Sequence, residues 1–268
     1  MNLVVLAAAV ARIVSTAPSA TEMLFAVGAG PRVVAVTRFC DYPPEVAALP
    51  KVGGFLDLSY EAILAARPDL VVGARNGANR DVVERLAAAG VGVEFPPAES
   101  IGETLAAIRA IGARVGAPGR GAAVAAEVER ALARVSGFVA GARPARAFVL
   151  YGDRPLVAAG AGTFADELLV RARGVNLAGD SAVRYPTMPV EAMAARTPDV
   201  VLDVSMPGSS ERSGGPASPL LAFPSVPAVR DGRLVALDAP EVVRPGPRLG
   251  RALELVARAL HPELFGAP

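Results

Sequence analysis

Cys40 and Asp41 are adjacent side chains of types that support nucleophilic chemistry, since a thiol becomes a strong nucleophile once a base removes its proton. That base is normally a histidine, and the only histidine, His261, is remote in sequence. The glycines at 28 and 30 lack the spacing of a dinucleotide-binding motif, and no P-loop motif is present. These residues therefore argue against an enzyme. An α/β enzyme is kept as the alternative from a different functional class.

Metal-ligating residues are sparse. A zinc or manganese site needs several histidine and carboxylate side chains that converge, and the single His261, directly before Pro262, predicts a C-terminal surface residue. Haem is different, because one tyrosine can ligate its iron. Tyr42, Tyr151 and Tyr185 are the candidates for that role.

Polar side chains follow two expected strands. Asn76 and Asn79 come after an apolar run at 69–73, Asp238 comes after a run at 233–237, and Arg244 lies a few residues further on. Open α/β sheets bind ligands at the carboxyl ends of their strands, which predicts ligand contacts for these groups. The alternatives are an ordinary Asn-Gly turn for the asparagines and surface charge for the other two.

One segment occurs twice. Residues 61–72 recur in close outline at 191–202, and each copy begins with a glutamate, Glu61 or Glu191, and ends with Pro-Asp before an apolar strand. A glutamate at a helix start is favoured by the helix dipole, which is one interpretation. The other is a pair of equivalent carboxylates that forms salt bridges to a two-fold symmetric receptor.

Hydrophobic periodicity predicts an α/β chain in which helices and strands alternate, which implies parallel sheets. Ser19 and Glu22 form a capping-box pattern that predicts a helix start. Residues 207–219 lack a buried-face pattern and are assigned no chemistry. The expected strands are 12–16, 32–37, 69–73, 91–95, 146–151, 199–205 and 233–237, and the expected helices are 23–27, 59–66, 79–89, 101–115, 121–139, 163–173, 189–196 and 247–260.

Length and composition set the domain organisation. The chain has 268 residues, 52% of them hydrophobic, which suffices for two lobes with buried cores. We expect lobes at 1–117 and 143–268, with one long helix between them at 118–142. The net charge is +1 without a basic stripe, so nucleic acid is not an expected partner.

The first residues allow two interpretations. Residues 3–11 are apolar and end in a small-residue pattern typical of a signal-peptide cleavage site, but no basic residue precedes them. They are either a shortened leader or an apolar first strand. No apolar stretch reaches the roughly 20 residues of a membrane-spanning helix, so we expect a soluble protein. The single cysteine excludes an intramolecular disulfide.

An ordered set of motifs resembles class III substrate-binding proteins of ABC transporters, most closely the periplasmic cobalamin (vitamin B12)-binding family. The motifs lie at 12–22, 38–44, 50–54 and 67–72. The resemblance implies two Rossmann-like lobes with parallel central sheets, joined by one long backbone helix, with a ligand cleft between the lobes. It also implies a periplasmic, monomeric binding protein that docks on a permease dimer through Glu61 and Glu191.

The resemblance further implies an aromatic ligand site at Phe39, Phe55 and Tyr185. A corrin ring is broad, flat and largely apolar, so aromatic faces suit it, while polar groups orient its amide fringe. The corrinoid is then a transported ligand, and no cofactor is expected. The full expected ligand-contacting set is Phe39, Asp41, Tyr42, Phe55, Asn76, Asn79, Tyr151, Tyr185, Asp238 and Arg244.

The sequence departs from the family in its aromatic residues. It has no tryptophan, and Ala74 stands where the family has one. Haem and a ferric siderophore therefore remain alternative cargoes, and a cytosolic corrinoid-binding protein without a transporter remains an alternative function.

Overall fold

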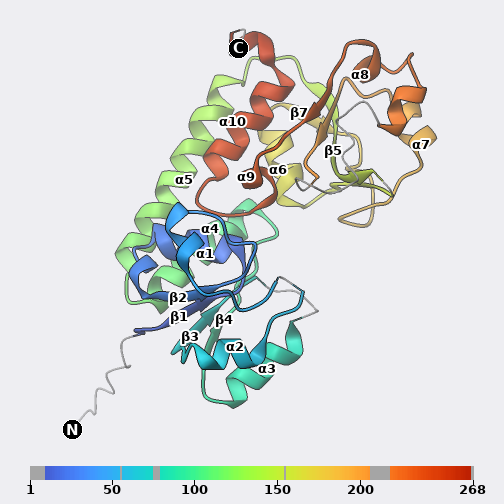
Figure 1. Cartoon of the computed structure of the whole chain (residues 1–268). Helices are drawn as coiled ribbons and strands as arrows, with labels where there is room; N and C mark the ends of the chain where they lie inside the picture. Colours follow the sequence, from blue (N-terminus) through green and yellow to red (C-terminus); the bar gives the residue numbers. More distant parts are fainter. Residues whose placement is uncertain (1–9, 55, 75–78, 154, 206–217, 267–268) are drawn as a thin grey trace. The chain divides into compact units, whose positions relative to one another are not determined.

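The chain divides into two compact units, which we call unit 1 (Met1–Ala98 with Gly102–Glu127) and unit 2 (Glu99–Ile101 with Val128–Pro268). A computed structural model describes residues 10–266 apart from 55, 75–78, 154 and 206–217, and Figure 1 shows the elements of both units. The expected leader or first strand at 3–11 and the expected loop at 207–219 lie almost wholly outside the described residues. The three-part division at 117 and 142 and the cleft between lobes stay predictions.

Unit 1 is a four-stranded parallel sheet in the order β2-β1-β3-β4. Its strands are β1 (Ile13–Ser15), β2 (Val33–Val36), β3 (Leu70–Val72) and β4 (Gly92–Glu94). Its helices are α1 (Pro18–Ala26), η1 (Gly30–Arg32), η2 (Pro44–Ala48), α2 (Tyr60–Ala65), α3 (Arg80–Ala88), α4 (Ile101–Arg114) and the first half of α5 (Pro118–Phe138). This strand order is that of a doubly wound fold, as the alternating pattern predicts.

Unit 2 repeats the α/β plan with a mixed sheet in the order β6-β5-β8-β9. Its strands are β5 (Ala145–Asp153), β6 (Leu156–Ala158), β7 (Gly174–Asn176), β8 (Val200–Asp203) and β9 (Leu234–Ala236). Its helices after α5 are α6 (Phe164–Arg171), α7 (Val190–Ala195), η3 (Pro219–Ala222), α8 (Pro227–Arg230), α9 (Pro240–Val243), α10 (Leu249–Leu260) and η4 (Pro262–Leu264). The predicted α/β fold with parallel sheets in two lobes is confirmed.

Strand β5 is longer than its neighbours and pairs differently along its length. Its first residues pair with β7 in parallel, its last residues pair with β6 antiparallel, and β8 runs parallel to its middle. Because β8 occupies one edge of β5, β6 and β7 share the other. The sequence pattern missed both β6 and β7, since β6 directly follows Pro155 and β7 has only one apolar side chain, Val175.

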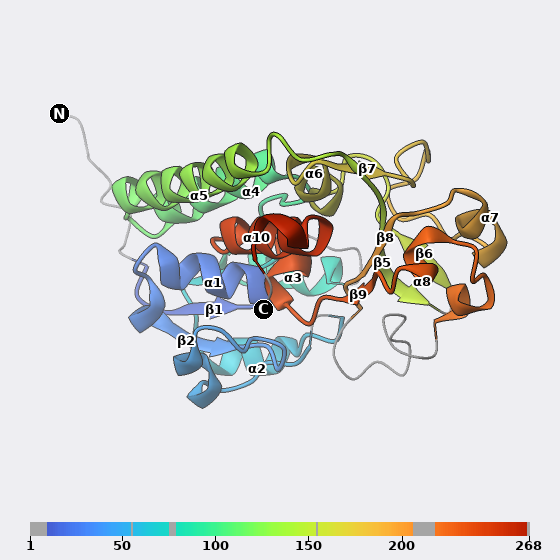
Figure 2. The ribbon, with the colours of Figure 1, turned by 90° about the horizontal axis from the view of Figure 1, so that it is seen from above.

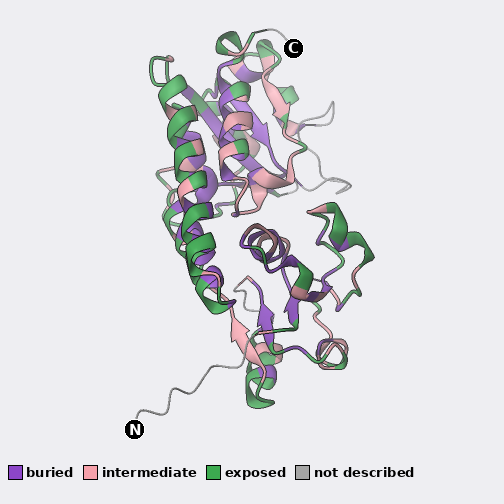
Figure 3. Ribbon diagram, turned by 90° about the vertical axis from the view of Figure 1, so that its left-hand side faces the viewer, coloured by how far each residue is buried: buried purple, intermediate pink, exposed green. Residues whose placement is uncertain are grey.

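The sheets form the centre of each hydrophobic core. Strands β1, β3 and β8 are buried along their whole length, and Figure 3 shows buried strands beneath helices that are exposed along one side. Helix α10 illustrates the pattern, because its buried residues recur at helical spacing. They are Leu249, Ala252, Leu253, Val256, Ala257 and Leu260.

Helix α1 begins earlier than predicted, and both α1 and α5 begin at a proline. Helix α1 begins at Pro18 and not at residue 23, and no side chain caps it, so the capping-box prediction from Ser19 and Glu22 is wrong. Helix α5 also begins at a proline, Pro118, which is the first residue of the expected interlobe helix at 118–142. Proline fits the first position of a helix because its missing N–H would have no partner there.

Helices α4 and α5 make a close contact within unit 1 and run side by side in Figures 1 and 2. A β-carbon at Gly112 would lie 2.7 Å from the Gly121 α-carbon and 3.1 Å from the Ala117 oxygen. In unit 2, the second half of α5 contacts α10, where Gly250 packs against Ala131. Glycine at these points allows the helix backbones to approach closely. Within the described residues, none of the helices is both long and apolar enough to cross a bilayer.

Candidate functional site

Aromatic side chains of unit 1 lie in the loop that follows β2. Phe39 is 41% exposed and Tyr42 is 45% exposed, with the exposed Asp41 between them. Two large aromatic side chains exposed in one short loop indicate a contact surface. The loop leaves the carboxyl end of β2, the edge at which open α/β sheets bind ligands. The structure therefore brings together three of the predicted ligand-contacting residues.

The other predicted contacts of unit 1 have different outcomes. Phe55 and Asn76 lie outside the described residues. Asn79 is only 3% exposed at the N-terminus of α3, so its side chain is largely shielded from any ligand that approaches the surface. Its ligand role stays a prediction, and its burial favours the structural alternative.

In unit 2, two predicted tyrosines meet beside an ion pair. The rings of Tyr151 and Tyr185 lie edge to face, with their centroids 5.5 Å apart. Arg184 lies next to Tyr185 in sequence and forms a salt bridge of 3.5 Å with Glu99. The hydroxyl of Tyr151 is buried and has no hydrogen-bond partner among the described residues. An apolar face with an unsatisfied hydroxyl suits a ligand that is largely apolar but carries polar groups.

Both phenols are held in their neutral form. Burial raises the pKa of Tyr151 above its ordinary value, with smaller contributions from Tyr185 and Glu99. Burial also raises the pKa of Tyr185, and the Glu99 carboxylate adds to that effect. A tyrosine that ligates ferric haem must lose its proton, and the surroundings of these two oppose that loss.

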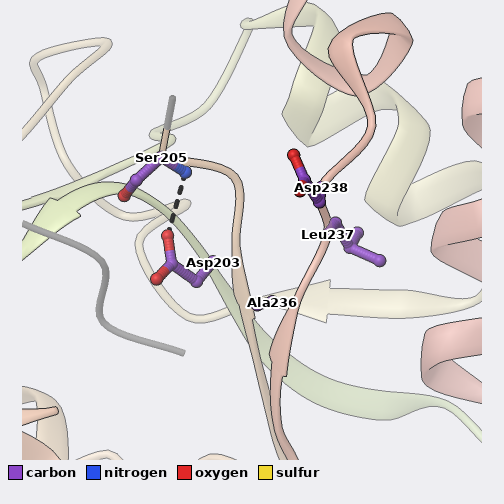
Figure 4. A pocket seen from close by; sticks show the side chains of 5 residues that line it. All are labelled: Asp203, Ser205, Ala236, Leu237 and Asp238. Atoms are coloured by element: carbon purple, nitrogen blue, oxygen red, sulfur yellow. Dashed lines mark hydrogen bonds between the residues drawn. The ribbon is translucent and has the colours of Figure 1, made fainter. Parts of the chain in front are cut away.

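A small pocket with two aspartates in its lining lies at the carboxyl ends of β8 and β9 in unit 2 (Figure 4). Asp203 and Asp238 line it together with Ser205, whose N–H donates to Asp203 Oδ1 at 2.9 Å. The hydroxyl of Ser205 is buried without a partner in the described part of the chain. Asp238 was predicted here, whereas Asp203 and Ser205 were missed because they were assigned to the end of a strand. The predicted Arg244 caps α9 and is not among the residues that line this pocket.

The repeated segment adopts the same structure in both units. Glu61 and Glu191 are exposed and lie in the first turns of α2 and α7, which have six residues each. Each helix ends before a residue with a left-handed backbone, Arg67 or Thr197, both with φ of 47°. Neither is a glycine, so the sequence alone gave no sign of this turn. The two carboxylates are thus carried by equivalent elements, while permease docking stays a prediction.

The aspartate that ends each copy has an equivalent bonding pattern. Asp69 Oδ2 accepts hydrogen bonds of 2.8 Å from the N–H groups of Ala11 and Arg12, and Asp199 Oδ2 accepts one of 2.9 Å from the N–H of Arg146. These contacts tie the turn of each copy to β1 or β5. The N–H donors of Ala11 and Arg12 lower the pKa of Asp69 below its ordinary value.

Replacing Asp69 by asparagine is expected to lower thermal stability at neutral pH. Because the folded-state pKa is lowered, the stabilisation is present above the unfolded-state pKa of about 3.9 and is lost as pH falls through the folded value. The difference in melting temperature between Asp69→Asn and wild type should therefore narrow below about pH 4. A difference that stays constant between pH 7 and pH 3 would contradict this account.

Cys40 and His261 do not form a nucleophile–base pair. Cys40 is buried, and its sulfur lies 3.1 Å from the hydroxyl oxygens of both Thr21 and Thr37, neither of which is a base. The prediction of a surface histidine is wrong, because His261 is 2% exposed and its Nε2 lies 2.8 Å from the Ala172 oxygen. His261 is four residues beyond the buried Ala257 and continues the buried stripe of α10.

Metal-ligating residues are likewise dispersed. Among the residues that the structure describes, no three histidine, cysteine or carboxylate side chains form a group that could hold a metal ion.

Comparison with known proteins gives a consistent result. A model of the family described as periplasmic binding protein matches residues 13–241. The vitamin B12-binding protein of Pectobacterium carotovorum is 27% identical over 251 residues, which cover 93% of this chain and 88% of that protein.

Solved structures are similar over nearly the whole chain. The periplasmic vitamin B12 binding protein BtuF of Vibrio cholerae is 26% identical, with a TM-score of 0.82, and the match covers 97% of this chain and 99% of that one. The periplasmic heme-binding protein RhuT from Roseiflexus sp. RS-1 is 31% identical, with a TM-score of 0.83 and coverage of 94% and 98%.

Proposed function

We propose that this chain, which belongs to the periplasmic binding protein family, is the extracytoplasmic ligand-binding subunit of an ABC importer and carries a cobalamin-like corrinoid. The main support for this ligand is the exposed aromatic ring of Phe39, which lies at the carboxyl edge of the unit 1 sheet. The Tyr151 and Tyr185 pair supplies a second aromatic surface in unit 2. Aromatic faces offer large contact areas to a flat macrocycle at little cost in side-chain entropy.

The polar groups of unit 2 favour a corrinoid over haem. A corrinoid carries a fringe of amides, whose N–H groups can donate to the exposed carboxylate of Asp238. Haem carries propionate carboxylates, which the Asp238 carboxylate would repel. Burial also raises the pKa of Tyr151 and of Tyr185, which opposes the loss of the proton that iron ligation requires. Haem is nevertheless the second candidate, because a heme-binding relative is 31% identical to this chain.

The role we propose is capture and delivery without catalysis. The permease would receive the loaded protein through Glu61 and Glu191, which are exposed at equivalent positions of the repeated segment. Delivery to a membrane permease also implies a location outside the cytoplasm.

A titration distinguishes the candidate cargoes. Purified protein is heated with cyanocobalamin, haemin or a ferric siderophore, because a ligand that binds only the folded state raises the melting temperature. Cyanocobalamin at about a hundred times its dissociation constant should raise the melting temperature by roughly 5–10 °C. A rise in melting temperature with haemin alone would identify haem as the cargo. No rise with any of the three ligands would contradict the proposed cargo class.

Replacing Phe39 by alanine tests the aromatic contact directly. We expect the dissociation constant for cyanocobalamin to rise about tenfold to a hundredfold, because the variant loses the stacked ring. Phe138→Ala is the matched control, since Phe138 is exposed but lies at the end of α5 and contacts Phe265. Equal affinities for the two variants would remove Phe39 from the site.

A further inference from the structure

Arg38 and Asp57 form a two-point ion pair beside Phe39. Arg38 Nη1 donates to Asp57 Oδ2 and Nη2 donates to Oδ1, each at 2.9 Å. This arrangement fixes the plane of the guanidinium as well as its position. Both side chains are more than half exposed, so the pair contributes little to global stability. Its main physical effect is to order two segments of unit 1. These are the loop after β2, which carries Arg38, and the residues before α2, which carry Asp57.

The backbone around this pair is shaped to receive it. Arg38 N–H donates to the Gly53 oxygen at 3.0 Å, and Gly54 N–H donates to the Asp57 oxygen at 3.4 Å. A β-carbon at Gly54 would lie 2.5 Å from Arg38 Nη2 and closer still to the Asp57 carboxylate, so the ion pair lies directly over this glycine. Gly53 has φ of +107°, a backbone conformation that side chains other than glycine rarely adopt.

The same guanidinium also contacts the aromatic ring. Arg38 Cζ lies 5.0 Å from the centroid of the Phe39 ring, within the range of a cation–π interaction. Asp57 therefore orients Arg38, and Arg38 lies against Phe39. An exposed phenylalanine without such a neighbour exchanges between rotamers. Ligand binding then fixes one rotamer, and the lost side-chain entropy weakens the affinity.

We infer that Arg38 is a positioning residue, which Asp57 holds so that its guanidinium keeps the Phe39 ring ready for the ligand before the ligand arrives. The inference rests on the proposed function, because Phe39 is the proposed ligand contact. Arg38 acts through Phe39 and makes no ligand contact of its own. Its loss lowers the fraction of molecules that are competent to bind, which raises the apparent dissociation constant in proportion.

Stopped-flow kinetics with cyanocobalamin test this role. Arg38→Gln should raise the dissociation constant about fivefold to tenfold, and the change should appear as slower association, with the dissociation rate within about twofold of wild type. Asp57→Asn should also lower the association rate, because the Arg38 guanidinium then lacks the carboxylate that holds it in place. Arg38→Lys should give an intermediate rate, since it keeps the charge but loses the two-point contact.

Asp231→Asn is the matched control, because Asp231 forms an exposed two-point pair with Arg230 in unit 2. It should leave both rate constants within about twofold of wild type. A faster dissociation rate in Arg38→Gln would overturn the positioning role in favour of a direct ligand contact. Unchanged kinetics in Arg38→Gln and Asp57→Asn would overturn the inference while the proposed cargo stands.

Hydrogen exchange tests the same role without a ligand. In Arg38→Gln, the amides of Arg38 and Gly54 should exchange about tenfold faster, since the turn that their hydrogen bonds close loses its side-chain bridge. If wild-type protein fails to bind cyanocobalamin, the proposed cargo is wrong, and this measurement still decides whether the Arg38–Asp57 pair orders the turn beside Phe39. Unchanged exchange at both amides would overturn it.

Discussion

Replacing Glu61 and Glu191 together by alanine will reduce permease-dependent uptake at least about tenfold while ligand affinity stays within about twofold of wild type. Each carboxylate is expected to accept charge-assisted hydrogen bonds from a basic residue of the permease, and each such bond is worth about 1.5–3 kcal/mol. Both glutamates lie in six-residue helices, and neither is among the predicted ligand-contacting residues. The single variants should give intermediate uptake.

The measurement pairs uptake by cells that carry the cognate permease with a binding titration of purified protein. Glu45→Ala with Glu263→Ala is the matched control, because these exposed glutamates also occupy the first turns of short helices, one in each unit. Normal uptake by the Glu61 and Glu191 double variant would exclude the docking role. Equal loss of uptake in the control would show a general effect of surface charge.

Replacing Gly112 by valine will destabilise the protein by about 3 kcal/mol. The added side chain meets the backbone of α5, where a β-carbon at Gly112 would lie 2.7 Å from the Gly121 α-carbon. A flexible side chain could move aside at small cost, whereas two packed helices must separate and lose contacts along their length. Gly112→Ala should show a smaller loss of the same kind.

Gly137→Ala is the control for this substitution. Gly137 also lies in α5, but a β-carbon there would meet no atom within 4 Å. Alanine should leave stability unchanged or raise it by up to about 1 kcal/mol, because it reduces the freedom of the unfolded chain. Urea denaturation of the variants measures both changes. Equal midpoints for Gly112→Val and Gly137→Ala would contradict the close contact between α4 and α5.

The sequence predicted the elements whose apolar pattern is strong. Strands β1, β3 and β8 are runs of buried residues, and α10 has a regular buried stripe, so periodicity located them within a few residues. Strands β6 and β7 escaped because β6 directly follows Pro155 and β7 has a single apolar side chain, Val175. The start of α1 was misplaced because the sequence offers two signals for a helix start, the capping-box pattern and Pro18. The helix begins at Pro18.

The candidate site was only partly predictable. Family motifs and strand ends predicted Phe39 and Asp238, and the structure places Phe39 exposed after β2 and Asp238 in the lining of the unit 2 pocket, while their ligand contacts stay predictions. Arg38 and Asp57 are joined by geometry alone, since they are 19 residues apart in sequence and share no periodic pattern. Asp203 and Ser205 could have been found from the rule that ligands bind at strand ends, had the strand been ended at 203.

The shielding of Cys40 has a consequence for the redox behaviour of the chain. Its thiol is 3% exposed and bonded to the hydroxyls of two threonines, so dissolved oxidants and the thiols of other molecules cannot readily reach it. With no second cysteine as a partner, the covalent structure should be the same in a reducing and in an oxidising compartment. A cysteine engineered at the protein surface would then be the only thiol that a fluorescent maleimide modifies in the folded protein.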